Sequence, residues 1–420
     1  MSKGDALRPI TLTAMEQELI AQEADQVISE TLAVNELYVA CGRQLPKSDW
    51  RHLKTKENFQ VYRTRKERRA RPQQQRTDHG NYTPNNTFAR DPTSASYSGS
   101  LMSSRQFSYT SSNSSSSPNN LSPHSQQSVI AKMKPQNIPL VVATGVISGT
   151  VEDAAFGALA HTETLWRSRD AHLKDEYAAI KILAVIREPT AQDPFRSLVL
   201  KWSTKRIGSL ARMRDCVFIE ANGIAFDSKG VPFAYNLVHS IDNIARIPGL
   251  KHLDVVRVNI STCYISRRYN QSSIEVFCRG FVDPGVSFTE IVSNTVYPNM
   301  VLTFIDVVDC ALMKKLVWLM HKKRNHSGSS HTLKSSSSRP ANCTICSTKS
   351  SGICNLVRSW VPCQACQTVV CQKCTVVKKL QVEVSRSEMK EKAMTFCLHC
   401  MVEAKEASTR QVASESVNIA

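Results

Sequence analysis

The sequence predicts an α+β fold in which helices enclose an antiparallel sheet, followed by a small cysteine-rich module. Strand-like runs follow one another through the middle of the chain, with an amphipathic helix before them and a long apolar helix after them. Such an order is typical of α+β domains rather than of alternating strand and helix units. Four Cys-x-x-Cys pairs then crowd into the last fifth of the 420 residues.

A capping box indicates where the first helix begins. Thr13 followed by Glu16 has the pattern in which each side chain caps the other residue's backbone N–H. Apolar residues then recur at three- and four-residue spacing, which predicts an amphipathic helix of about six turns. They are Leu19, Ile20, Ala24, Val27, Ile28, Leu32 and Leu37. Strands over 58–63 and 139–148 follow, and we expect the segment between them to be an insertion in a hairpin.

Six further strand-like runs are separated by turn signals. They cover residues 178–187, 195–204, 216–226, 233–239, 255–265 and 274–281. In the fifth run Val256, Val258 and Ile260 alternate with polar residues, which indicates a half-buried antiparallel strand. A helix capped by Thr150 precedes the runs. A long apolar helix over residues 301–324 follows them and ends in cations, which suit a helix C-terminus.

Shifts in composition divide the chain into six segments. Ser, Asn, Gln, Thr and Pro dominate after the first strands, and such a segment buries too little apolar area to offset its chain entropy. We expect the N-terminal helix and first strands over 14–70, a disordered insertion over 71–136, the remainder of the sheet domain over 137–325, a linker over 326–341, the cysteine-rich module over 342–404 and a disordered tail over 405–420.

The cysteine pairs have the spacing of zinc ligands, because each Cys-x-x-Cys knuckle places two sulfurs on one ion. The eight predicted ligands are Cys343, Cys346, Cys363, Cys366, Cys371, Cys374, Cys397 and Cys400. Eight thiolates saturate two structural zinc ions, and the short gap between the second and third pairs favours cross-bracing, with pairs one and three on one ion. A disulfide framework is the alternative, but it needs an oxidising compartment, and we do not expect one because residues 1–20 contain no apolar run typical of a secretory leader. We expect Cys354 and His399 to be bystanders.

The formal net charge of +17 is unevenly spread. Residues 51–72 hold nine Lys and Arg against two acids, and residues 311–340 hold seven against none. Such blocks are either solvated linker edges or contacts to an anionic membrane surface, and nucleic acid is the least favoured partner. No apolar stretch approaches the roughly 20 residues that span a bilayer, so any membrane contact is expected to be peripheral.

The cysteine-rich module resembles the second half of a FYVE zinc finger, a small treble-clef-like domain. The resemblance rests on the segment from Cys363 to Cys374 and on Phe396 to Cys400. RING and PHD fingers are less similar, since both place a His among the ligands. FYVE domains bind phosphatidylinositol 3-phosphate through a basic motif before the third ligand, where this chain has Arg358 to Pro362 and largely lacks that motif. The resemblance therefore covers the metal scaffold and not the head-group site.

The preceding domain resembles the START (StAR-related lipid transfer) domain, a helix-grip fold whose curved antiparallel sheet surrounds a long C-terminal helix. The similar segments are Leu200 to Trp202, Arg214 to Phe218 and Arg279 to Gly285. START domains hold a sterol, phospholipid or sphingolipid in an interior cavity, and the terminal helix helps to gate it. The resemblance thus implies a lipid in the cavity, although its contacts are unknown from sequence.

Three classes of function remain open. We expect a non-enzymatic lipid-binding or lipid-transfer protein in the cytoplasm, possessing a zinc finger that tethers it to endosomal or other membranes, or to proteins. A degenerate START/FYVE adaptor that binds protein partners without lipid is the first alternative. A helix-grip hydrolase or cyclase is the second, but no nucleophile with a positioned base is evident beside Cys263 or Cys278.

Overall fold

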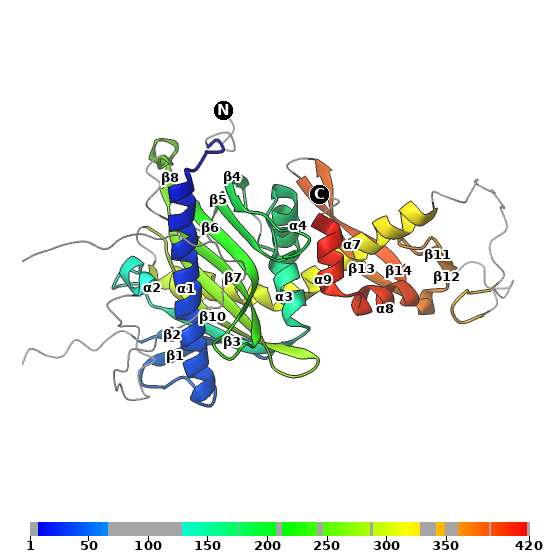
Figure 1. Cartoon of the computed structure of the whole chain (residues 1–420), viewed down its shortest axis with the longest axis horizontal. Coiled ribbons are helices and arrows are strands. Elements are labelled where there is room, and N and C mark those ends of the chain that lie inside the picture. The colour runs from blue at the N-terminus through cyan, green and yellow to red at the C-terminus, as the bar shows by residue number, and fades with distance from the viewer. Residues whose placement is uncertain are drawn as a thin grey trace, which may run out of the picture.

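A ten-stranded sheet, with helices on both faces, is the centre of the molecule (Figure 1). The computed structural model describes residues 7–65, 128–175, 177–206, 212–241, 247–285, 289–327, 342–348, 360–385 and 388–417. No helix within these ranges is long and apolar enough to cross a membrane. The predicted α+β class, an antiparallel sheet with a long helix near its C-terminal end, is confirmed.

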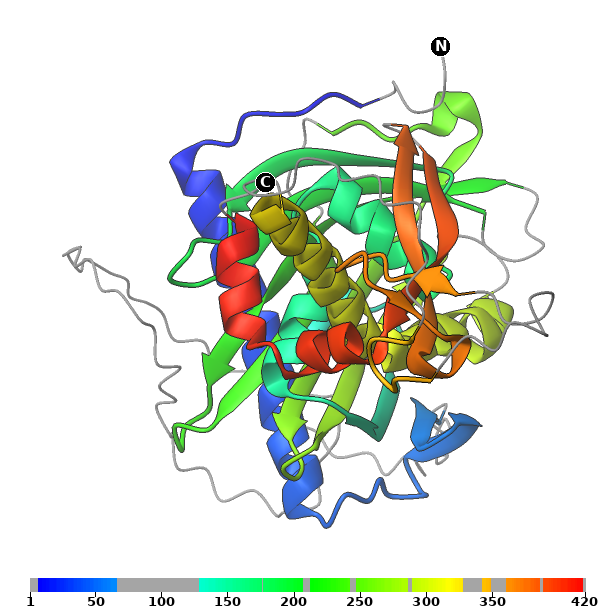
Figure 2. The same ribbon diagram turned by 90° about the vertical axis from the view of Figure 1, so that its right-hand side faces the viewer.

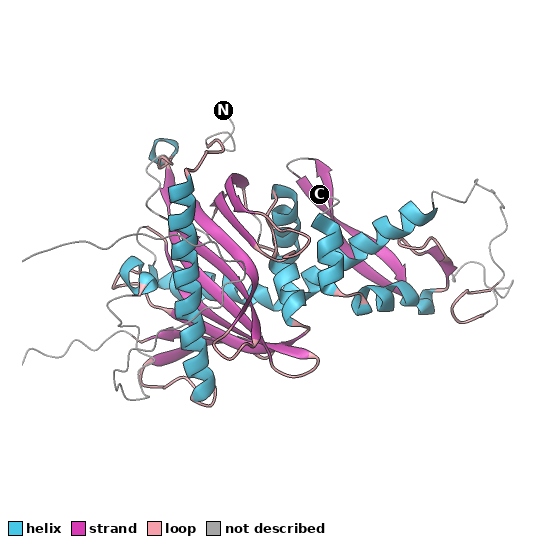
Figure 3. Ribbon diagram, viewed as in Figure 1, coloured by secondary structure: helices cyan, strands magenta, loops and turns pink. Residues whose placement is uncertain are grey.

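The sheet runs in the order β1-β2-β3-β10-β9-β7-β6-β5-β4, and β8 pairs with β6. All pairs are antiparallel except β6 with β8. In Figure 3 the strands change direction strongly from one edge of the sheet to the other. The bounds are β1 Trp50–Lys56, β2 Phe59–Thr64, β3 Val141–Ser148, β4 Ala179–Arg187, β5 Ser197–Lys205, β6 Met213–Phe226, β7 Pro232–Ser240, β8 Val255–Arg257, β9 Asn259–Arg268 and β10 Ser273–Asp283.

Helix α1 (Ala14–Ala40) covers one face of the sheet, with the short α2 (Val129–Met133) beside it. Thr13 and Glu16 form the predicted capping box. The buried stripe of α1, including Val27 and Ile28, packs on strand residues such as Trp202 and Phe277. The predicted hairpin is also confirmed, because β2 and β3 pair although the intervening insertion lies largely outside the described residues.

The other face carries α3 (Val151–Ala158), α4 (Glu163–Leu173) and a helical run that follows β10. That run consists of α5 (Thr289–Ile291), the π-helix η3 (Val292–Val296), α6 (Tyr297–Leu302), the 3-10 helix η4 (Thr303–Asp306) and α7 (Val307–Ser327). The predicted helix over 301–324 is therefore broken into parts. Helix α6 lies against β1, β2, β3 and β10, whereas α7 packs on α3 and points away from the sheet.

The cysteine module, defined here as residues 342–406, packs against the free side of α7. It contains β11 (Val361–Pro362), β12 (Val369–Val370), the 3-10 helix η5 (Gln372–Cys374), the hairpin of β13 (Thr375–Ser385) and β14 (Glu388–Cys397), and helix α8 (Leu398–Glu406). Leu316 and Leu319 of α7 are completely buried in one apolar cluster with Phe396 and Ala404 of the module. The module thus shares a core with the sheet domain.

Helix α9 (Thr409–Val417) follows the module and returns to the sheet domain (Figure 2). Val412 is fully buried, and Thr409 Oγ1 donates to Asp153 Oδ1 over 2.7 Å. Arg410 Nε lies 3.0 Å from Glu152 Oε1, and Trp318 Nε1 of α7 donates to a carboxylate of α9. The prediction of a disordered tail over 405–420 is therefore wrong for residues 405–417, because α8 extends to 406 and α9 has apolar and charged partners on α3 and α7.

Two other sequence predictions need correction. Residues 128–136 belong to α2 and its flanks rather than to the disordered insertion, because Ile130 is buried beside α1. The predicted strand over 255–265 is two strands: β8 runs parallel to β6, and β9 starts at Asn259. The alternation predicts that Ser261 lies on the solvated face. In the structure Ser261 is fully buried beneath α1, where its hydroxyl forms a hydrogen bond with His239.

Helix α9 supplies a test of this docking. Val412→Asp places an unpaired carboxylate in a closed apolar site, so we expect it to lower the free energy of unfolding by roughly 3 kcal/mol. Val402→Asp on the exposed face of α8 is the matched control and should change it by less than about 0.5 kcal/mol. Chemical denaturation of both variants checks this, and equal effects would contradict the docking of α9.

Candidate functional site

A cavity of about 450 Å³ lies between the sheet and the helices on its α4 side. Strands β5, β6, β7, β9 and β10 form one wall, and α4 and the helical run over 292–303 form the other. Most of this wall is apolar, with Phe218, Val238, Ile260, Val292 and Met300 among its residues. The volume is within the range of pockets that enclose small organic ligands.

A buried ionic network stands at the closed end of the cavity. Glu220 on β6 accepts hydrogen bonds from both terminal nitrogens of Arg169 and from Lys201 Nζ, the last over 2.7 Å. Lys201 also donates to the carbonyl of Ala160 over 2.6 Å and lies 4.4 Å from the centre of the Trp166 ring. Every charge of this trio has partners, so the network holds α4 on the sheet without a ligand.

Burial and mutual attraction set the pKa values of the network. Burial alone would raise the pKa of Glu220, but the charges of Arg169 and Lys201 outweigh it and lower that pKa to about 2. For Asp170 burial is the larger effect, and its pKa is raised to about 7 despite the neighbouring Arg169. Oδ2 of Asp170 has no hydrogen-bond partner among the described residues.

Exposed side chains mark the open end of the cavity. Lys174, Thr295 and Asn299 belong to its wall and are exposed to solvent. Asn299 accepts a hydrogen bond from Lys54 Nζ of β1 over 2.6 Å. The π-helix η3 supplies Val292, Thr295 and Val296 to the same wall, and π-helical turns are frequent at functional sites because they interrupt the α-helical hydrogen-bond pattern.

Two tryptophans and two arginines on or near the sheet have different surroundings. Trp202 packs beneath α1, as a core tryptophan should, whereas Trp166 lies in the cavity wall. Arg279 is buried, with 4% of its surface exposed. Arg257 binds the buried Asp215 through two nitrogens, at 2.9 and 2.7 Å. The motif from Arg214 to Phe218 therefore joins β6 to the segment before β9.

Two cysteines and one serine of the sheet are buried too deeply to act as nucleophiles. Burial raises the pKa of Cys263 to about 12 and raises the pKa of Cys278 well above its ordinary value, so both are poor nucleophiles. On the α1 side of the sheet, His239 bridges Ser261 and Glu23, at 2.9 and 3.2 Å. Ser261 and His239 are both completely buried, so this chain of hydrogen bonds connects α1 to the sheet and presents no hydroxyl to a substrate.

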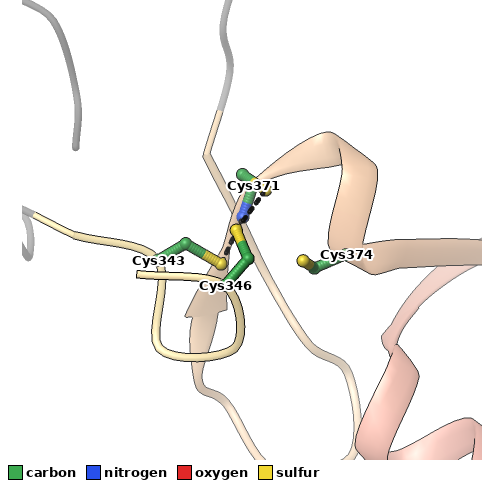
Figure 4. Close-up of side chains that lie close together, drawn as sticks. All are labelled: Cys343, Cys346, Cys371 and Cys374. Atoms are coloured by element: carbon green, nitrogen blue, oxygen red, sulfur yellow. Dashed lines mark hydrogen bonds between the residues drawn. The ribbon is translucent and has the colours of Figure 1, made fainter. Parts of the chain in front are cut away.

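The eight predicted ligands form two groups of four. Cys343, Cys346, Cys371 and Cys374 form the first group (Figure 4). The second group contains Cys363, Cys366, Cys397 and Cys400. Pairs one and three thus come together, as do pairs two and four, which is the predicted cross-braced grouping. Three cysteines of the second group are buried in the apolar cluster shared with α7 and Cys366 is partly buried, whereas Cys346 of the first group is exposed.

Both groups have the dimensions of a tetrahedral thiolate site. Four sulfurs at about 2.3 Å from a common ion lie about 3.8 Å apart. The Sγ atoms of Cys346 and Cys371 are 3.6 Å apart, and those of Cys366 and Cys397 are 3.8 Å apart. Backbone N–H groups also point at the sulfurs, as at Cys397 N to Cys363 Sγ over 3.3 Å. His399 is not among the grouped residues, and Cys354 lies outside the described residues.

No family model and no curated protein matches the sequence. The solved structure of human STARD10 has a TM-score of 0.36 at 11% identity, covering 70% of this chain and 88% of that chain. The solved structure of human StAR-related lipid transfer protein 5 has a TM-score of 0.36 at 10% identity, covering 70% of this chain and 97% of that chain. The solved structure of the Zhui aromatase/cyclase from Streptomyces has a TM-score of 0.23 at 10% identity, covering 40% of this chain and 90% of that chain.

Sequence reasoning missed the ionic network. Its only signal is a lysine and a glutamate of opposite charge, each in the middle of an apolar strand: Lys201 within β5 and Glu220 within β6. An isolated charge in a buried strand requires a partner. The register of β5 and β6, and the approach of Arg169 from α4, identify that partner only in three dimensions.

The metal content of the chain tests the cysteine groups. We expect two zinc ions per chain, and at most one after Cys374→Ser or Cys400→Ser, because each removes one ligand of a closed site. Cys41→Ser changes an exposed thiol outside both groups and should leave two. Elemental mass spectrometry of desalted protein measures the ratio. A ratio unaffected by all three substitutions would contradict the assignment.

Asp170, at the closed end of the cavity, makes the stability of the protein depend on pH. Its folded pKa of about 7 exceeds the ordinary value, so its contribution to stability is present at low pH and is lost as pH rises toward 7. Relative to Asp170→Asn, the wild-type protein should lose up to about 1.4 kcal/mol of unfolding free energy per pH unit between pH 5 and 7. Chemical denaturation at several pH values checks this, and a constant difference would contradict it.

Proposed function

We propose that this chain is a non-enzymatic lipid-binding or lipid-transfer protein of START-like fold, with a FYVE-related module that holds two structural zinc ions. The observation that carries the proposal is the cavity of about 450 Å³ between the sheet and the α4 side helices. Its apolar wall suits an acyl chain or a sterol ring system. An adaptor that bound only proteins would have no need of this volume.

The satisfied network at the closed end also supports a carrier. Glu220, Arg169 and Lys201 complete one another's hydrogen bonds, so the empty protein keeps its cavity without buried unpaired charge at that end. A catalytic cavity would need a nucleophile and a base aimed inward. The carboxylate and amines of this trio instead bind one another and the end of α3.

For the cysteine module we propose a structural role first and tethering second. Its contacts with α7 and α4 fix it to the sheet domain, through ion pairs such as Lys378 with Asp309 at 3.1 Å. Its exposed apolar residues Val377, Leu398 and Val402 remain available to a membrane surface or a protein. A cytoplasmic protein that contacts anionic membranes peripherally is consistent with the basic blocks of the sequence.

A substitution that fills the cavity tests the carrier function. Val258→Trp adds a large side chain to the wall, so we expect at least a tenfold loss of bound lipid with little change of fold. Val185→Trp on the exposed surface of β4 is the matched control and should bind lipid normally. Native mass spectrometry after incubation with mixed liposomes measures the bound lipid.

The same measurement separates carrier from adaptor. A discrete lipid mass on the wild-type protein, lost in Val258→Trp and kept in Val185→Trp, is the expected result. If the wild-type protein carries no lipid after purification from cells and after incubation with liposomes, the carrier proposal fails. The adaptor, which binds partners through its surface, would then be favoured.

A further inference from the structure

Arg214 is a buried cation in the cavity wall that no carboxylate of the described residues neutralises. It is the second residue of β6, and only 3% of its surface is exposed. One terminal nitrogen donates to the carbonyl of Arg212, and Nε has no hydrogen-bond partner in the described part of the chain. Burial lowers the pKa of Arg214 and the charge of Arg212 lowers it further, so its surroundings do not stabilise the cation.

Apart from Lys174, the other charges of the wall are paired. Arg169 binds Glu220, Lys205 binds Asp175, and the carboxylate of Asp215 binds Arg257. Arg214 and Lys174 remain without an ion pair among the described residues, and Lys174 is exposed at the open end. A mostly apolar cavity with surplus positive charge is electrostatically suited to a ligand that brings negative charge.

The strand places this surplus charge at the open end. Arg214 and Glu220 both project from β6 into the cavity wall, six residues apart, which is about 20 Å along a strand. Arg214 pairs in register with Lys205, whose Asp175 partner follows Lys174 in the chain. The unpaired guanidinium therefore lies near the solvent-exposed rim, and the satisfied network lies at the other end.

We propose that Arg214 is an anion-binding residue, and that the cavity takes an acyl lipid whose carboxylate or phosphate head group binds Arg214 at the open end while its chain points toward Glu220. This inference rests on the proposed function, because it assigns the lipid class of the same cavity. A guanidinium presents several N–H donors to such a head group in fixed geometry. The apolar residues between the two ends cover the chain.

Two matched pairs of oleoyl lipids test the proposal. Oleate is compared with oleyl alcohol, and 1-oleoyl lysophosphatidic acid with 1-oleoylglycerol, all as monomers below their micellar concentrations. Each pair has one chain and differs in head-group charge. We expect the wild-type protein to bind the anion of each pair about tenfold or more tightly, and Arg214→Gln to lose that preference, as a charged hydrogen bond predicts. Arg214→Lys should keep part of it.

Controls separate a structural effect from loss of the anion contact. Arg212→Gln removes a neighbouring cation that is exposed and pairs with Asp254, so it should bind all four lipids as wild type does. Arg214→Gln should bind the two neutral lipids within about threefold of wild type and unfold at a similar temperature. Equal loss of all four lipids, or no preference in the wild-type protein, would overturn the proposal.

Inorganic phosphate and glycerol 3-phosphate distinguish a lipid head group from a free anion. We expect each of them to displace oleate only at a concentration at least a hundredfold higher than the concentration of lysophosphatidic acid that does so, because they lack the acyl chain. If either binds as tightly as lysophosphatidic acid, the residue serves a free anion and the lipid assignment is wrong. A wild-type protein that binds none of the four lipids would overturn the carrier function itself and this assignment with it.

Discussion

Five consecutive backbone carbonyls at the end of α3 connect the parts of this protein. The last carbonyls of a helix have no partner within the helix and carry partial negative charge. Here Lys314 of α7 binds those of Phe156, Gly157 and Leu159, while Arg169 and Lys201 bind the carbonyls of residues 158 and 160. The basic side chains of Lys314, Arg169 and Lys201, from α7, α4 and β5, thus converge on one segment, and Glu220 supplies the opposing charge to the last two.

The same segment needs a close approach of α3 and α7. A Cβ atom on Gly157 would lie 1.9 Å from the carbonyl oxygen of Val307, so only glycine fits there. That closeness brings the Lys314 ammonium to the carbonyls, and burial lowers its pKa to about 7. Asp153 at the start of α3 binds Lys315 of α7 and Thr409 of α9, so both ends of this short helix hold neighbouring elements.

Local signals in the sequence were sufficient for features that depend on neighbours in the chain. Such features include the capping boxes of α1 and α3 and the Cys-x-x-Cys knuckles. The spacing of the knuckles also predicted which pairs come together. The network around Glu220, the unpaired Arg214 and the docking of α9 depend on residues far apart in sequence. A polar helix such as α9 resembles a solvated tail until Asp153, Glu152 and Trp318 are seen to be its partners.

These contacts connect the cysteine module with the cavity through α7. Zinc binding to two closed thiolate sites would supply most of the free energy that folds the module, since so small a unit has little core of its own. The folded module buries Leu316 and Leu319, and this fixes the helix from which Lys314 reaches the end of α3. Because Arg169 and Lys201 bind that same end, the cysteine module is connected through α7 to the closed end of the cavity, although it does not line the cavity.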